Sequence, residues 1–366
     1  MVGRDMNLVC KSTGRALVLA TFAAIAAFPA QAGEFKGVLN TPAQATQLAA
    51  QRPLNAVVAS GLRLIAAGPR GHIVYSDDNG ASWKQASVPV SSDLTAVFFS
   101  SERYGWAVGH DGVVLHSADA GQTWQLQLDG NRAAALMKEH YARLAAAGDA
   151  QAAALLPEID GYVAAGADKP FLDVWFANDR VGFIVGAFNL IFRTVDGGKT
   201  WEPWFDRVEN PRRLHFYAIR GQGGRLYVVG EQGLVAYLDA GAQRFATLPS
   251  PYAGSFFGVL PVNGGAVVYG MRGNAFRIDG PGANWQKLDT GVVGGLTAAI
   301  GLGDDRLALV STAGDVLVGS VDSGRFKRVK APREMLFAGV AYVPATQSLA
   351  SVGSAGASIV PLAQKQ

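Results

Sequence analysis

An eight-residue pattern of the form S/T-x-D-x-G-x-S/T-W occurs three times in this chain and constrains its fold more than any other feature. The copies are Ser76–Trp83, Ser117–Trp124 and Thr194–Trp201. In each octet the Asp side chain can accept hydrogen bonds from backbone N–H groups of a tight turn, and the Gly supplies a conformation that other residues resist. The closing Trp begins a strand and offers a large apolar surface. The octets therefore predict turns between antiparallel strands, and they carry little chemistry of their own.

Each octet follows two apolar segments that are joined by a glycine-bounded hairpin. Before the second octet, for example, Trp106–Gly109 and Val113–His116 flank the triplet His110–Gly112. Weaker copies of the same arrangement follow to the end of the chain. The Gly that ends the second strand recurs about every 40 residues, which with about four strands per unit is typical of a β-propeller. We expect an all-β fold, a seven-bladed β-propeller, over residues 33–366.

The last unit of this series has only three predicted strands, at Phe337–Tyr342, Leu349–Gly353 and Ser358–Leu362. The N-terminal run 33–40 contains the apolar residues of a fourth strand. If this run closes the seventh blade, it ties both ends of the chain into one sheet and removes an open sheet edge. The alternative that the run is a leader outside the sheet stays open.

Residues 1–32 have the pattern of a secretory signal peptide. Lys11 and Arg15 precede the apolar run Ala16–Phe28, and Ala30–Ala32 has the small residues of a cleavage site. We expect cleavage after Ala32 and a periplasmic mature protein. The apolar run is short for a transmembrane helix, so we do not expect the mature chain to span a membrane.

The charge balance and the histidines exclude several classes of function. The whole chain has a formal charge of +3, but 29 basic and 28 acidic residues remain without residues 1–32. A nearly neutral exported protein is not expected to bind nucleic acid. The five histidines lack the spacing of zinc ligands, and the glycines punctuate hairpins and do not open a helix as a phosphate loop does. We therefore expect no metal and no cofactor.

Residues 131–169 interrupt the β pattern between the second and third blades. Arg132–Ala147 is rich in Ala and has Leu136, His140 and Leu144 at helical spacing, flanked by Met137 and Tyr141. Asp149 can cap a second short helix that runs through Leu156 and stops at Pro157. We predict a helical insertion of two helices.

In a propeller, the hairpins inside each blade share a face with the connections between blades, and the octet turns lie on the opposite face. The helical insertion should therefore lie beside the hairpin residues and the basic connection after the third octet. Long insertions on a rigid scaffold often carry function. The alternative is that the helices cover an apolar groove and the arginines are only solvated. The candidate partner-binding residues are Arg70, Met137, Tyr141, Phe188, Arg207, Arg212, Arg213 and Arg272.

The strand pair Trp-Ala-Val-Gly-x-x-Gly before an octet resembles the photosystem II stability and assembly factor family of the Ycf48 type. The match is best over Tyr104–Trp124 and Val181–Trp201 and extends over nearly the whole mature chain. The resemblance implies an exported seven-bladed propeller of BNR or Asp-box repeats that binds membrane-protein intermediates without catalysis. It also implies that the octets are structural Asp boxes, whose defining residues are Asp78, Gly80, Trp83, Asp119, Gly121, Trp124, Asp196, Gly198 and Trp201.

The helical insertion and the degenerate later octets depart from the family pattern, so we expect a relative outside photosynthesis. Some such relatives are associated with transporters of the RND type. The expected function is a periplasmic scaffold, assembly factor or accessory factor of a membrane-protein complex, with an RND or MMPL transporter as the partner considered. We expect no catalytic residue.

Two other classes of function stay open. Asp boxes also occur in sialidases and other glycoside hydrolases, which generally need paired carboxylates. On the hairpin face only Asp111 and Glu231 are clear carboxylates. A propeller that binds a small ligand is the second alternative, because Arg70, Phe188, Met271 and Arg272 would suit an apolar acid.

Overall fold

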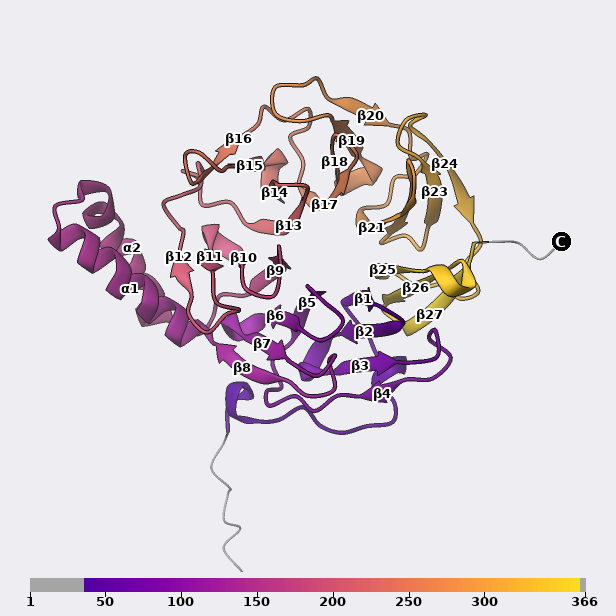
Figure 1. Cartoon of the computed structure of the whole chain (residues 1–366), viewed down its shortest axis with the longest axis horizontal. Helices are drawn as coiled ribbons and strands as arrows, with labels where there is room; N and C mark the ends of the chain where they lie inside the picture. The colour runs from indigo at the N-terminus through magenta and orange to yellow at the C-terminus, as the bar shows by residue number, and fades with distance from the viewer. Residues whose placement is uncertain (1–35, 363–366) are drawn as a thin grey trace, which may run out of the picture. The chain divides into compact units, whose positions relative to one another are not determined.

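The computed structural model describes residues 36–362, which form seven antiparallel sheets and two α-helices (Figure 1). Six sheets have four strands and the last has three, and in every sheet the strands follow one another in sequence order. The first three sheets are β1 (Ala56–Ser60), β2 (Arg63–Ala67), β3 (Ile73–Ser76) and β4 (Lys84–Gln85); β5 (Leu94–Phe99), β6 (Gly105–Gly109), β7 (Val114–Ser117) and β8 (Gln125–Leu128); and β9 (Phe171–Phe176), β10 (Gly182–Gly186), β11 (Ile191–Thr194) and β12 (Glu202–Pro203).

The remaining sheets repeat this order with longer first strands. They are β13 (Phe216–Gln222), β14 (Arg225–Gly230), β15 (Val235–Asp239) and β16 (Arg244–Thr247); β17 (Phe256–Val262), β18 (Gly265–Gly270), β19 (Ala275–Ile278) and β20 (Gln286–Leu288); β21 (Leu296–Gly303), β22 (Arg306–Ser311), β23 (Val316–Ser320) and β24 (Arg325–Val329); and β25 (Phe337–Val343), β26 (Ser348–Gly353) and β27 (Gly356–Pro361).

The sheets are arranged around a common centre, as the blades of a β-propeller are, with the first strand of each sheet nearest that centre (Figure 1). Each first strand packs beside the first strand of the next sheet, and β25 packs beside β1. The buried apolar clusters lie between successive sheets, because each sheet is apolar on both faces. The predicted all-β class and the count of seven units agree with this architecture.

The recurring Gly at the end of the second strand has a steric cause. A Cβ atom on Gly109 would lie 2.1 Å from the carbonyl oxygen of Asp93, and one on Gly230 would lie 2.0 Å from that of His215. In six sheets the backbone entering the first strand passes close to this Gly, and sheet six has Ser311 there instead. A residue without a side chain suits that approach best, which explains the period in the sequence.

The second and third strands of five sheets are joined by a one-turn 3₁₀ hairpin. These hairpins are η3 (Pro69–Gly71), η4 (His110–Gly112), η5 (Ala187–Asn189), η6 (Glu231–Gly233) and η7 (Met271–Gly273). The middle residue of each has a left-handed backbone, with φ between 51° and 59°. Three further 3₁₀ turns are η1 (Val38–Asn40), η2 (Ala49–Gln51) and η8 (Pro344–Thr346).

The octets join the third and fourth strands, and their side chains have the hydrogen bonds that the sequence suggested. The carboxylate of Asp119 accepts from the N–H of Gln122 at 3.1 Å, and from the N–H and hydroxyl of Thr123 at 3.0 and 2.7 Å. The Ser117 hydroxyl donates to Asp119 at 2.8 Å and accepts from the N–H of Gly121 at 2.9 Å. Asp78 and Asp196 have corresponding partners.

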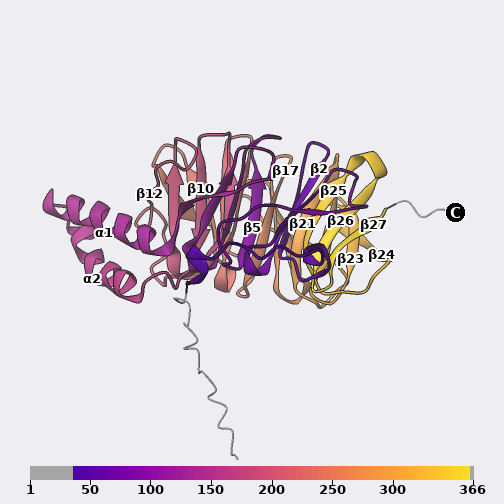
Figure 2. The same ribbon diagram turned by 90° about the horizontal axis from the view of Figure 1, so that it is seen from below.

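The two helices lie between sheets two and three, where the insertion was expected, and project from the side of the sheets (Figure 2). Helix α1 is Gly130–Ala146 and is capped by Asp129, and helix α2 is Ala150–Ala165 and is capped by Asp149. The prediction that Pro157 ends the second helix is wrong, because α2 continues for two further turns. Burial of Leu155 and Ile159 on either side of Pro157 stabilises the helix enough to offset the lost N–H bond.

The predicted closing strand at 33–40 is wrong in its described part. Residues 33–35 lie outside the described residues, and Val38–Asn40 is the 3₁₀ turn η1. Val38 accepts a hydrogen bond from the N–H of Ser91 at 2.9 Å, so this segment lies against the connection between sheets one and two. The seventh sheet keeps three strands. The signal-peptide prediction for 1–32 also falls outside the described residues.

Candidate functional site

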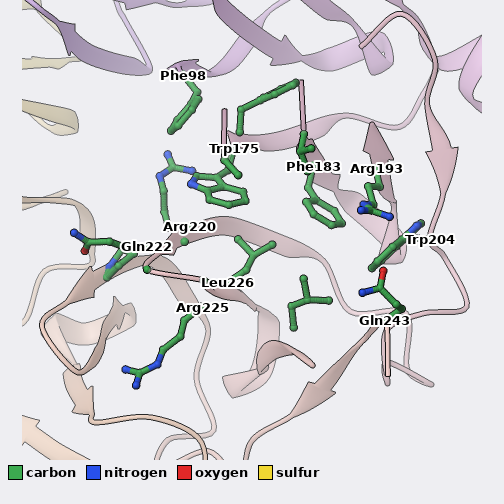
Figure 3. Close-up of a pocket in the computed structure, with 18 residues that line it drawn as sticks. Phe98, Trp175, Phe183, Arg193, Trp204, Arg220, Gln222, Arg225, Leu226 and Gln243 are labelled. Atoms are coloured by element: carbon green, nitrogen blue, oxygen red, sulfur yellow. The ribbon is translucent and has the colours of Figure 1, made fainter. Parts of the chain in front are cut away.

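A cavity of about 560 Å³ opens between sheets three and four, on the face that carries the octet turns (Figure 3). Its walls come from the turn between β9 and β10, the turn between β13 and β14, and the end of β15. The lining residues are Phe98, Trp175, Phe176, Ala177, Val181, Phe183, Arg193, Trp204, Arg220, Gly221, Gln222, Gly223, Gly224, Arg225, Leu226, Leu238, Gln243 and Pro261.

The floor of the cavity is part of the core between the two sheets. Phe183, Trp204 and Leu226 are at most 4% exposed and belong to one buried cluster. Phe183 lies edge-on to Trp204, with ring centres 5.1 Å apart. Because these side chains are held by core packing, the aromatic wall is rigid before any ligand arrives. Such preorganisation lowers the cost of binding.

Arg193 supplies the positive charge at one end of the cavity. It lies on β11 opposite Phe183, and its guanidinium is 5.2 Å from the centre of a Trp204 ring (Figure 3). Among residues 36–362 no carboxylate lies within ion-pair distance of this guanidinium. The side chain is half-buried, so its charge is partly shielded from water.

In the fifth sheet, the arginine at the matching position is paired with carboxylates of the protein itself. Arg277 occupies the matching place on β19, opposite Val267. Its guanidinium pairs with Asp279 at 2.7 Å and with Asp322 at 2.5 Å. Two residues after Arg193 the chain has Val195 where the fifth sheet has Asp279. The third sheet thus keeps the cation and lacks the anion.

A second arginine, at the other end of the cavity, is already paired. Arg220 forms an ion pair with Asp173, a buried carboxylate that also accepts the N–H of Ile219 at 2.8 Å. Burial opposes the charged guanidinium, but the charge of Asp173 outweighs this and raises the pKa of Arg220. Arg220 also lies 6.0 Å from the ring centre of Phe98. Its charge therefore belongs to the scaffold. Two lining arginines, Arg193 and Arg225, form no ion pair among the described residues; Arg225 donates to the carbonyl of Gly264, and Arg193 lies beside the aromatic wall.

The chemistry of the lining favours binding. Aromatic and aliphatic side chains form most of the surface, with amides at the rim from Gln222 and Gln243. No Asp, Glu, His, Cys, Ser or Thr is among the lining residues, so the cavity offers neither a nucleophile nor an acid–base pair. An apolar body with one carboxylate would match an apolar cavity that has the unpaired Arg193 beside its aromatic wall.

Two of the predicted partner-binding residues are core residues, and this corrects the sequence-based prediction. Met137 is 1% exposed and Tyr141 is 0% exposed. The hydroxyl of Tyr141 donates to the carboxylate of Asp206 at 2.6 Å, and burial, aided by Asp206, raises the pKa of Tyr141. Helical periodicity located both residues on one face of α1, but that face packs on the propeller and not on a partner.

The predicted arginines after the third octet differ in their surroundings. Arg213 donates to both carboxylate oxygens of Glu158 on α2 at 3.0–3.2 Å. These bonds hold the helical insertion against the connection that follows sheet three. Arg207 lies 5.0 Å from a Trp204 ring and 3.8 Å from Glu202. Arg212 is exposed. Of the three, Arg212 keeps a free surface position.

The predicted hairpin residues lie apart from the cavity. Arg70, Phe188 and Arg272 are the left-handed middle residues of η3, η5 and η7, on sheets one, three and five. All three side chains are exposed, and Phe188 is 44% exposed. The strained backbone turns these side chains outward on the hairpin face. The structure therefore spaces them around that face and does not gather them into one pocket.

The sequence contained a signal for the cavity that pattern reading missed. Arg193 is a charged residue that follows the apolar run Leu190–Phe192 and directly precedes the octet that begins at Thr194. The octet is followed by Pro203-Trp204, which adds a second Trp that the other octets lack. In this chain Arg193 and the additional Trp204 both line the cavity between sheets three and four. Trp175 and Leu226 also line it, but only the packing of the sheets brings them there.

Comparisons with known proteins agree with the fold. A family model described as photosynthesis system II assembly factor YCF48 matches residues 51–143 and 161–318. A solved structure of YCF48 bound to D1 peptide superposes with a TM-score of 0.61 at 15% identity, covering 88% of this chain and 97% of that chain. YCF48 from Cyanidioschyzon merolae gives a TM-score of 0.60 at 12% identity, covering 87% and 97%.

Two further similarities show how far the comparisons extend, one by its low sequence identity and one by its short alignment. The WD40 propeller domain of Doa1 superposes with a TM-score of 0.64 at 10% identity, covering 90% of this chain and 98% of that chain, so the superpositions show the fold alone. The chloroplastic photosystem II stability/assembly factor HCF136 of Cyanidioschyzon merolae is 44% identical over 48 residues. That alignment spans 13% of this chain and 11% of the relative's length.

Proposed function

The chain belongs to the family of photosystem II assembly factor YCF48, and from this premise we propose that it is a non-catalytic binding factor for a membrane-protein complex. One observation carries the proposal, the aromatic cavity between sheets three and four with its uncommitted Arg193. A solved relative is bound to a peptide, D1 peptide in that case. For this chain we propose that the cavity holds a peptide segment of the partner.

The geometry defines what such a segment looks like. One apolar side chain fills the space over Phe183 and Leu226, and a carboxylate reaches Arg193. Hydrogen bonds that involve a charged group contribute about 1.5–3 kcal/mol each. The segment is therefore a peptide with an apolar residue beside a free carboxylate, from a C-terminus or from an acidic side chain.

We further propose that the protein works in the periplasm after cleavage behind Ala32, and that its partner is a membrane transporter of the RND or MMPL type. The signal-like pattern of residues 1–32 supports export. Among the described residues, no helix is long and apolar enough to cross a membrane. The octets have a structural role as Asp boxes in this proposal, because their carboxylates are occupied by the turn itself.

A binding experiment tests the cavity directly. The probes are a short peptide ending in Leu-Phe with a free carboxylate and the same peptide with an amide end. We expect the acid to bind at least about tenfold more tightly, since about 1.4 kcal/mol corresponds to a factor of ten. Arg193→Gln should remove this preference. Arg277→Gln is the matched control, because it removes the same charge where Asp279 and Asp322 already pair with it.

The cellular partner is tested by photo-crosslinking from the cavity rim. A benzophenone amino acid at Gln243 should form an adduct with an integral membrane protein, and Arg193→Gln should reduce its yield. Equal affinity for the acid and the amide would refute the role of Arg193. Adducts with soluble proteins alone would refute the membrane partner.

A further inference from the structure

The seventh sheet has three strands where the other six have four. Its third strand, β27, shows the consequence. In β27 Ala357, Ser358 and Ile359 are half-buried. The third strands β15 and β23 have as many half-buried residues, but each of them pairs with a fourth strand. Among residues 36–362, β27 is the third strand that pairs with no fourth strand.

The free edge of β27 has a defined set of hydrogen-bonding groups. The N–H of Leu362 donates to the carbonyl of Gln347 on the β26 side at 3.1 Å. Since backbone groups alternate along a strand, Ser358 also faces β26, and Ala357 and Ile359 face outward. Within residues 36–362 no strand pairs with β27 from that side. Pro361 falls on the outward side as well, which is where a sheet tolerates a residue without an N–H.

The octet of sheet one is uncovered at the same place. Trp124 and Trp201 are 4% and 5% exposed, but Trp83 is only half-buried. The chain that leaves β4 covers the next octet, because the N–H of Trp124 donates to the carbonyl of Ser87 at 3.0 Å. Parallel bridges of this kind join sheets one and two, three and four, and five and six. None reaches Ser82 or Trp83 among the residues described, and in that part of the chain sheet seven has no fourth strand from which such a bridge could continue.

A groove of about 440 Å³ lies against Trp83. It is lined by Ala45, Thr46, Gln47, Ala49, Ala50, Val74, Trp83 and Gln85, none of which is charged. Ala357 and Ile359 of β27 pack near the same Trp. A charged side chain placed in this groove would lose water without gaining a counter-ion, so the complementary occupant is uncharged.

We propose that the outward edge of β27 and the Trp83 groove form a docking site for an uncharged, extended segment of a partner protein. The segment adds to sheet seven as a fourth strand, a recognised mode of peptide binding. Ala357 and Ile359 offer two N–H and two C=O groups, and Trp83 receives an apolar side chain. The inference rests on the proposed function for the existence of a partner, but it uses a different surface and needs no carboxylate.

The test uses the strand that the protein itself places at the equivalent position. The probe is an acetylated and amidated peptide with the sequence of Thr123–Leu128, which is uncharged and contains β8. Amide exchange measured by NMR should slow at Ala357 and Ile359 by about tenfold when the peptide is present at about ten times its Kd. The indole resonance of Trp83 should shift in the same titration.

Two variants locate the effect. Ala357→Pro removes one outward N–H and should abolish the slowing. Thr247→Pro makes the same change on β16, the edge of a complete four-stranded sheet, and should leave peptide binding unchanged. Because the peptide carries no carboxylate, Arg193→Gln should also leave it unchanged, so failure here is distinguishable from failure of the cavity proposal. If Ala357→Pro does not fold, the NMR map of the native chain still locates the peptide.

Three results would overturn the proposal. The first is no slowing at Ala357 and Ile359 with the peptide at millimolar concentration. The second is slow exchange at both amides in the free protein at every protein concentration, which would mean that the chain already covers its own edge. The third is slowing that rises with protein concentration alone, which would make a second copy of the chain the occupant.

Discussion

Replacing Met137 by Ala tests whether the helical insertion is part of the propeller core or an arm attached to it. Met137 lies on α1, is 1% exposed, and belongs to the same buried cluster as Phe171 and Leu190 of the third sheet. An arm that serves only a partner would tolerate the change. A core element would lose the packing of the side chain and gain a cavity.

The magnitude follows from the surroundings of Met137. Removing a buried Met, Leu or Ile side chain to Ala costs about 2–5 kcal/mol, and the cost rises with the cavity that remains. A small void of about 20 Å³ already adjoins Met137. The new cavity would merge with this void, and the backbone of α1 is held by Tyr141 and Asp206 one turn away, so little collapse is expected. We expect a loss of about 3 kcal/mol.

Urea unfolding followed by Trp fluorescence measures this loss, and thermal unfolding checks it. In domains of about 150–250 residues, about 1 kcal/mol changes Tm by about 2–4 °C, and the change is smaller in a larger domain such as this one, so Tm should fall by at most about 6 °C. Val163→Ala on α2 is the control, because Val163 is 42% exposed, and it should stay within about 0.5 kcal/mol of the native chain. If Met137→Ala is as mild as Val163→Ala, the helices are not part of the core and the correction made for Met137 and Tyr141 fails.

Three further predictions concern the repeats, the helix and the octets. Gly230→Ala should destabilise the protein by at least about 2 kcal/mol in urea unfolding, since its Cβ would lie 2.0 Å from a carbonyl oxygen, whereas Gly301→Ala meets nothing within 4 Å and should be nearly neutral. Pro157→Ala should raise the midpoint of thermal unfolding, because it restores an N–H donor inside α2. Hydrogen bonds from Ser82 lower the pKa of Asp78 from 3.8 to about 2. The contribution of the Asp78 carboxylate to the free energy of unfolding is therefore complete above about pH 4 and is lost as the pH falls toward about 2. Asp78→Asn should flatten that part of the plot of stability against pH.

The sequence predicted the repeat well because the signals of the repeat are local. A turn such as Ser117–Trp124 is specified by side chains that bond within eight residues of one another. The Gly at 109 and 230 marks a backbone contact that recurs in six of the seven sheets. Both kinds of signal are periodic, so seven weak copies together identify the architecture. The family assignment depends on the same local patterns.

The candidate site was not predicted because its residues meet only through the packing of neighbouring sheets. Trp175 and Leu226 are 51 positions apart in sequence, and each reads as an ordinary strand residue. Conversely, the apolar spacing of α1 was read correctly as a helix, but the spacing does not say what the apolar face contacts. Met137 and Tyr141 were therefore placed on a docking surface, although they are buried. The prediction that Pro157 ends the second helix is wrong for a related reason. Burial of Ile159 in the tertiary structure stabilises the helix by more than the helix-breaking preference of proline destabilises it.

The contrast between Arg193 and Arg277 shows how a repeat protein acquires a binding site without new architecture. Both arginines lie at one strand position, and the scaffold holds both in the same way. One difference is the residue two places later, Asp279 in one sheet and Val195 in the other. Arg277 also pairs with Asp322 of sheet six, and Arg193 has neither partner. Without these carboxylates the arginine is a cation that faces a cavity. Val195→Asp should therefore restore the internal pair and weaken binding of a carboxylate peptide as Arg193→Gln does, while a peptide with an amide end binds as before. An acid preference that survives Val195→Asp would show that Arg193 is free for another reason.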